Sequence, residues 1–173
     1  WQNIKGAIWL SAEEQMANQF PFIQGDVIGT TVVLALGIAE THQEHELWLV
    51  LSPDCDCIRS PYVRVAPVFP VYGGDKVNND RMQRFGHSLK LATHKAFPLP
   101  VLPSDDSDTS LLGYFADLET PYFLAEQDKN LATPFASLTI TGWHLLNGLI
   151  QDKETRAVNI REAIAIRTYD SNS

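Results

Sequence analysis

The segment with the most reactive side chains is Ser52-Pro53-Asp54-Cys55-Asp56-Cys57, which follows the apolar run 47–51. It places two thiols and two carboxylates within four residues, which allows four interpretations. As a metal site it needs distant ligands such as His87 or His94, because the thiolates of a Cys-X-Cys pair rarely complete a tetrahedral zinc shell. As a catalytic site it needs a thiolate at Cys55, and the negative charges of the flanking acids disfavour that form unless a His or Arg lies against it.

The two remaining interpretations of this segment involve no reaction. A disulfide between Cys55 and Cys57 is strained, and its absence agrees with a reducing compartment. In the structural interpretation, one Cys is buried as a small apolar residue while Asp54 or Asp56 accepts backbone N–H groups in a tight turn. We favour the structural interpretation, and we predict neither a metal nor a cofactor. The two acids beside a buried strand still form a candidate pocket edge.

A second feature is a basic stretch within an acidic chain. The net charge is −8, yet residues 59–95 hold seven Lys and Arg against two Asp, which gives +5. We favour charge balance and solvation as the explanation, with a phosphate-binding surface as the functional alternative. The candidate binding residues are Arg59, Arg64, Arg81, Arg84, His87 and Lys90. Because broad nucleic-acid binding requires many neutralised phosphates, the overall acidity restricts any RNA contact to a local one.

The elements that must position these residues form a β-rich first half and a helical end. Runs of Val, Ile, Leu and Thr predict the strands, and Pro67 indicates an edge or a bulge. The predicted strands cover 26–36, 47–52, 62–69, 97–102 and 111–118, with loops at 40–46 and 103–110 and an apolar turn at 122–125. The predicted helices cover 12–19, 78–87, 158–166 and a stretch to about Lys153 that Thr139 or Thr141 caps. We expect Trp48 in the core or at an interface.

Three short motifs occur in a fixed order on the predicted strands: Gly25-Asp26-Val27, Leu49-Val50-Leu51-Ser52 and Val65-Ala66-Pro67. The segment from Gln24 to Phe69 that carries them resembles the PemK/MazF toxins. The resemblance implies an SH3-like β-barrel with C-terminal helices, and it matches Leu111 to Leu118 with a later strand of that family. The predicted fold class is therefore α+β, mainly β.

The sequence departs from this family at its catalytic positions. The family's endoribonucleases use an Arg before the Leu-Val-Val-Ser strand and a Thr after Val-Ala-Pro, and these positions fall on Glu46 or Leu47 and on Phe69. A carboxylate or an alkyl group cannot replace a guanidinium at a phosphodiester, where developing negative charge must be stabilised. The resemblance thus implies the scaffold without the usual chemistry.

Two functions follow from this departure. The first is a noncatalytic binding or regulatory module in a bacterial toxin–antitoxin or defence context. The second is a divergent endoribonuclease with a rearranged site, for which the candidate catalytic residues are Asp54, Asp56, Cys55, Arg64 and His87. Convergence of Cys55, Arg64, Arg84 and His87 in one pocket would favour the enzyme, and scattering would favour the binding module.

The resemblance also implies partners and an organisation of the chain. Family members form homodimers and bind a small antitoxin, so we expect a homodimer and a partner of that type. We predict one domain over 1–173, with a helical lead-in at 1–23, the β-barrel at 24–120 and a mostly helical part at 121–173. We expect a cytoplasmic protein without membrane contact, because no stretch approaches roughly 18 apolar residues and no signal-peptide pattern opens the sequence.

Overall fold

The computed structural model describes residues 8–10, 22–30, 34–35, 38–41, 47–73, 83, 86, 95–105, 107–119 and 122–151. These residues form a sheet of nine strands: β1 Asp26–Gly29, β2 Leu34–Ala35, β3 Ile38–Thr41, β4 Leu47–Val50, β5 Tyr62–Tyr72, β6 Ala96–Leu99, β7 Leu111–Asp117, β8 Tyr122–Ala125 and β9 Thr133–Ser137. The helical elements are α3 Asp54–Arg59, the 3-10 helices η3 Pro103–Asp105 and η4 Glu126–Leu131, and a helix over residues 140–151, called helix 140–151 below. The predicted class, mainly β with helices, is confirmed.

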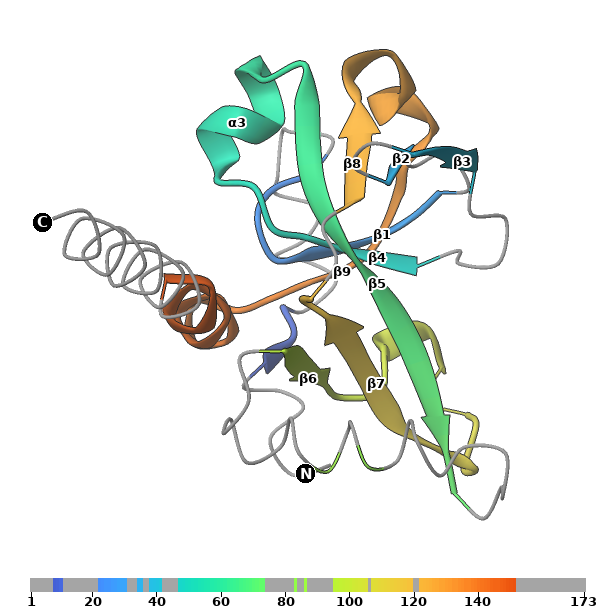
Figure 1. Cartoon of the computed structure of the whole chain (residues 1–173). Coiled ribbons are helices and arrows are strands. Elements are labelled where there is room, and N and C mark those ends of the chain that lie inside the picture. The colour runs from blue at the N-terminus through green and yellow to red at the C-terminus, as the bar shows by residue number, and fades with distance from the viewer. Residues whose placement is uncertain are drawn as a thin grey trace, which may run out of the picture.

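Strand β5 joins two parts of the sheet, because its two halves pair with different strands (Figure 1). Its first half lies between β4 and β8, and its second half pairs with β7, which in turn pairs with β6. Pro67 lies between Val65, the last residue paired with β8, and Val68, the first paired with β7. Since proline has no backbone N–H to donate, it fits where the partner changes, although it is buried rather than at an edge of the sheet.

The three sequence motifs lie on neighbouring strands, in the order β1, β4, β5. Val27 pairs with Leu49, and Leu49 pairs with Ala66. The full strand order is β3-β2-β8-β5-β4-β1-β9. Among the described residues no pairing joins β3 to β9, so the strands form an open sheet rather than the closed barrel that the resemblance implies.

The core lies on both faces of the β1–β4–β5 region because successive side chains of a strand point to opposite faces. Val27, Leu49 and Ala66 belong to one buried cluster. Trp48 and Val65 belong to another, on the other face. Trp48 is fully buried, and its indole N–H donates to the carbonyl of Thr30 at 2.9 Å, which confirms it as a core residue.

Several predicted elements differ from the structure. The predicted strand 26–36 is divided between β1 and β2, and β3 takes up the start of the predicted loop 40–46. Residues 122–125 form strand β8 rather than a turn, because β8 pairs with both β5 and β2. Together with β9, it extends the sheet into the region predicted to be mostly helical.

The predicted helix that runs to about Lys153 is confirmed in its described part. Helix 140–151 follows Thr139, whose hydroxyl accepts the backbone N–H of Gly142 at 3.3 Å, as an N-cap does. The predicted helices 12–19 and 158–166 lie outside the described residues, as does 78–87 apart from residues 83 and 86. No helix in the described ranges is long and apolar enough to cross a membrane.

Candidate ligand pocket

Residues Asp54 to Cys57 belong to the short helix α3 instead of a turn. Two of their side chains, those of Cys57 and Asp54, have structural roles. Cys57 is buried, and its thiol donates to the carbonyl of Ser52 at 3.4 Å. Burial, with a smaller contribution from the nearby Asp54 carboxylate, raises the pKa of Cys57 to about 12, so the thiol stays protonated near neutral pH. Asp54 accepts the backbone N–H of Gln24 at 2.9 Å. The burial of one Cys and the acceptance of a backbone N–H by one Asp are therefore confirmed, but the tight turn is not, because the donor to Asp54 lies 30 residues away.

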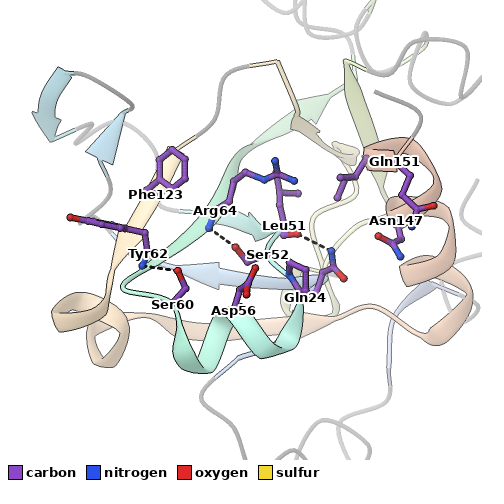
Figure 2. Close-up of a pocket in the computed structure, with 12 residues that line it drawn as sticks. Gln24, Leu51, Ser52, Asp56, Ser60, Tyr62, Arg64, Phe123, Asn147 and Gln151 are labelled. Carbon is purple, nitrogen blue, oxygen red and sulfur yellow. Dashed lines mark hydrogen bonds between the residues drawn. The ribbon is translucent and has the colours of Figure 1, made fainter. Parts of the chain in front are cut away.

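A pocket of about 550 Å³ opens between α3, the end of β4, the β5–β8 pair and helix 140–151 (Figure 2). Its volume falls in the range of small-molecule sites in proteins. It is lined by Gln24, Leu51, Ser52, Pro53, Asp56, Ser60, Tyr62, Arg64, Phe123, Asn147, Ile150 and Gln151. The lining thus combines two aromatic rings, one cation, one carboxylate and several amides and hydroxyls.

One wall of the pocket is the outward face of the β5–β8 pair. Arg64 lies directly opposite Phe123 in the ladder, and Tyr62 precedes Arg64 by two residues on the same face. The alternate residues Val63 and Leu124 are fully buried on the inner face. Tyr62 is 54% exposed, so this wall presents an accessible aromatic ring, which points away from the Arg64 side chain (Figure 2).

Gln24 forms hydrogen bonds with three of the elements that surround the pocket. Its backbone N–H donates to Asp54 of α3, and its side-chain amide donates to the carbonyl of Leu51 at 2.8 Å. Its side-chain oxygen accepts the indole N–H of Trp143 from helix 140–151 at 2.9 Å. Because Gln24 is itself buried, these bonds fix α3, the end of β4 and helix 140–151 relative to one another.

Two serines and a lysine hold the junction between α3 and β5. The hydroxyl of Ser52 accepts the backbone N–H of Arg64 at 2.8 Å, and that of Ser60 accepts the backbone N–H of Tyr62 at 3.3 Å. The buried Lys129 of η4 donates its ammonium group to the carbonyl of Ser60 at 2.9 Å, at the C-terminal end of α3. A cation at this end of a helix is favoured by the helix dipole. The backbone under Tyr62 and Arg64 is therefore well fixed.

The structure brings together only part of the predicted site. Asp56 and Arg64 line the pocket, whereas Asp54, Cys55 and Arg59 do not. Cys55 is exposed on α3 and does not line the pocket, so it does not converge with Arg64 there, as the enzyme interpretation required. The other candidate binding residues, Arg81, Arg84, His87 and Lys90, lie outside the described residues.

The sequence reasoning missed the aromatic and amide residues of the pocket. Tyr62 and Arg64 alternate with Val63 and Val65, and this period of two could have placed them together on an outward face. Phe123 required knowledge that β8 pairs with β5. For Gln24, Asn147 and Gln151 no signal in the sequence marks the pocket.

Of the positions that match the family's catalytic residues, the two that the structure describes, Leu47 and Phe69, are not part of the pocket. Phe69 stacks on Phe115 at 5.2 Å between ring centroids. Glu46 lies outside the described residues. In the part of the chain that the structure describes, no three His, Cys, Asp or Glu side chains are grouped as metal ligands.

Comparison with solved structures gives a distant likeness, and comparison with protein families and curated proteins gives none. Among solved structures, the chain is similar to a chain in the crystal structure of MazE-MazF (Form-I) from Deinococcus radiodurans, with 12% sequence identity and a TM-score of 0.43. The match covers 80% of this chain and 99% of that chain. A likeness this distant does not assign the chain to a family.

Proposed function

We propose that this protein is a noncatalytic binding module that holds single-stranded RNA in the pocket beside β5 and β8. The observation that carries the proposal is the set Tyr62, Arg64 and Phe123 on one outward face of the β5–β8 pair. Proteins commonly bind single-stranded RNA by stacking its bases on aromatic side chains of a sheet, with arginine at a phosphate or over a base. This wall offers both kinds of group within one pocket.

The noncatalytic part of the proposal rests on the ionisable side chains of the pocket. Asp56 and Arg64 are the charged side chains among the described residues of its lining, which include no histidine or cysteine. Cleavage of RNA by a protein side chain needs a positioned proton acceptor and a proton donor. Cys57 is held as a neutral thiol, and Asp54 already accepts a backbone N–H. These residues support binding better than catalysis.

The setting of the proposal comes from the sequence resemblance. PemK/MazF-like proteins act in bacterial toxin–antitoxin systems, and we place this module in such a system or in a related defence system in the cytoplasm. A homodimer and a small partner of the antitoxin type belong to the same proposal. A module of this kind would sequester or present RNA without cutting it.

Binding of a short, labelled single-stranded RNA, measured by fluorescence anisotropy, tests the proposal. We expect Tyr62→Ala to weaken binding by about 1–3 kcal/mol, the usual contribution of one stacked base, and Tyr62→Phe to retain it. Arg64→Gln should also weaken binding. Arg59→Gln is the matched control, because Arg59 is a nearby cation on α3 that does not line the pocket.

Three results would count against the proposal. Absence of RNA binding would overturn it, and equal losses for Arg59→Gln and Arg64→Gln would point to a diffuse basic surface instead of the pocket. Cleavage of the labelled RNA by the wild type, abolished by Arg64→Gln or Asp56→Asn, would establish the divergent endoribonuclease in its place.

A further inference from the structure

The two long walls of the pocket differ in chemistry (Figure 2). The β5–β8 wall carries Tyr62, Arg64 and Phe123, and the α3 wall carries Asp56. A base that stacks on an aromatic ring of the first wall still has its hydrogen-bonding edge exposed. The groups that remain available around the pocket therefore decide which base fits.

Three polar side chains of the pocket lining, those of Gln24, Ser52 and Ser60, already have hydrogen-bond partners within the protein. The Gln24 side chain donates to Leu51 and accepts from Trp143. The hydroxyls of Ser52 and Ser60 each accept a backbone N–H of β5. Because breaking these bonds leaves their partners unsatisfied, above all in the buried contact of Gln24 with Leu51, these side chains are poor candidates for reading a base.

Asp56 differs from these residues. It lies in the first turn of α3 and is exposed at the pocket edge. Within the described part of the chain, the hydrogen bond to its carboxylate comes from the Cys55 thiol at 3.7 Å, and a thiol is a weak donor. An ionised carboxylate offers two acceptor oxygens and no donor, so its best partner presents two neighbouring N–H groups.

We propose that the pocket selects guanine among the four RNA bases, an inference that rests on the proposed function. The Asp56 carboxylate accepts hydrogen bonds from N1–H and the N2 amino group of guanine. On the Watson–Crick edge, guanine is the base with two adjacent donors. Adenine, cytosine and uracil each place an acceptor beside their donor, a ring nitrogen in adenine and cytosine and a carbonyl oxygen in uracil. An acceptor atom against a carboxylate is repelled and loses its water without compensation. The Asp56 carboxylate thus disfavours adenine, cytosine and uracil and favours guanine.

The walls around Asp56 suit this role. Tyr62 and Phe123 supply aromatic surface for the plane of the base, and Asn147 on helix 140–151 supplies an amide that can both donate and accept. Arg64 carries the positive charge that a phosphate of the same strand requires. A guanine base in RNA and a free guanine nucleotide share this chemistry, so the experiment must separate them.

Competition anisotropy with short RNAs that differ at one base tests the selection. We expect the guanine RNA to bind about tenfold more tightly than the adenine, cytosine and uracil forms, since a bidentate contact discriminates by about that factor. Inosine, which lacks the N2 amino group, should lose part of this preference, and 7-deazaguanine should retain it. Free GMP is tested as a competitor at matched concentration, and we expect it to compete less well than the RNA.

Asp56→Asn should reduce the preference for guanine to about twofold or less while RNA binding itself persists, because the amide replaces one acceptor with a donor. Glu126→Gln is the matched control, since it removes an exposed carboxylate of η4 that does not line the pocket. It should leave the preference unchanged.

The outcomes separate this inference from the proposed function. Equal affinity for all four bases, or a guanine preference that survives Asp56→Asn, would overturn the selection while leaving RNA binding intact. No affinity for any RNA would overturn both. Tighter binding of GMP than of guanine RNA would keep the role of Asp56 and replace RNA by a free nucleotide as the ligand.

Discussion

Asp26, the acid of the Gly25-Asp26-Val27 motif, has a structural role. It is 3% exposed, and one carboxylate oxygen accepts the backbone N–H of Ile23 at 2.8 Å. The other oxygen is buried without a hydrogen-bond partner in the described part of the chain. Burial raises the pKa of Asp26 above its ordinary value, and the nearby Ser137 hydroxyl and the backbone N–H of Ile23 oppose this shift only in part. The motif therefore contains a carboxylate whose charge is unfavourable to folding.

We predict that Asp26→Asn stabilises the protein, relative to wild type, more at about pH 7 than at about pH 4. An acid whose pKa is raised by folding binds its proton more tightly in the native state. Its ionised form therefore lowers stability above the native pKa, and this loss disappears as the pH falls towards the unfolded value. Urea unfolding of both proteins at the two pH values gives the difference.

The comparison between pH values isolates the charge, because any packing effect of the amide is the same at both. Asp108→Asn is a control of opposite sign, since the hydroxyl and backbone of Ser110 lower the pKa of the exposed Asp108. A stability difference for Asp26→Asn that does not change with pH would show that Asp26 does not titrate as its burial indicates.

At the scale of single residues, the sequence predicted whether a side chain is buried or accepts a hydrogen bond better than it predicted which residue that side chain contacts. It predicted that one cysteine would be buried and that an acid would accept a backbone N–H, and Cys57 and Asp54 do so. It did not predict which residue Asp54 contacts, because Gln24 lies 30 positions away and only the packing of α3 against β1 and β4 brings them together. Contacts of this length are set by the tertiary fold and leave no local pattern.

At the element scale, strands with a strong local pattern were predictable and those defined by pairing were not. β4, β5 and β7 are apolar runs, and their predicted ranges agree with the structure to within a few residues. β9 contains Pro134 and exposed residues at its start, so its composition does not indicate a strand. It exists because β1 offers an unpaired edge, to which β9 pairs.

Helix 140–151 contributes Asn147, Ile150 and Gln151 to the pocket, and the Trp143 indole N–H links it to Gln24. We predict that Trp143→Phe lowers the free energy of unfolding by about 1–3 kcal/mol, because it leaves the buried oxygen of Gln24 without its donor. RNA affinity should fall as well, since the helix that closes the pocket is less firmly held. Urea unfolding and anisotropy measure the two effects.

Leu145→Ala is the control on the same helix. Leu145 is 40% exposed, whereas Leu146, Leu149 and Ile150 of the same helix are buried. It does not line the pocket, so its truncation should leave RNA affinity unchanged. If Trp143→Phe lowered stability but left affinity at the wild-type value, the helix would not position the pocket.

At the scale of the whole molecule, the charge distribution limits how RNA can bind. The chain carries −8 overall, and the described lining of the pocket contains one cation, Arg64, and one carboxylate, Asp56. Affinity must therefore come from stacking and hydrogen bonding, with long-range attraction contributing little. The alternative from the sequence, a surface built from the whole basic stretch 59–95, would bind mainly through phosphates.

The salt dependence of binding separates these two arrangements. One phosphate contact on a single strand predicts a slope of about −0.7 for the logarithm of the association constant against the logarithm of salt concentration. Contacts from the five Lys and Arg among the candidate binding residues predict a slope of about −3.5. We expect the shallow slope for the wild type and a slope near zero for Arg64→Gln, because Arg64 is the cation of the pocket. Anisotropy titrations across a range of KCl concentrations measure both, and a steep slope that Arg64→Gln barely alters would move the binding surface from the pocket to the basic stretch.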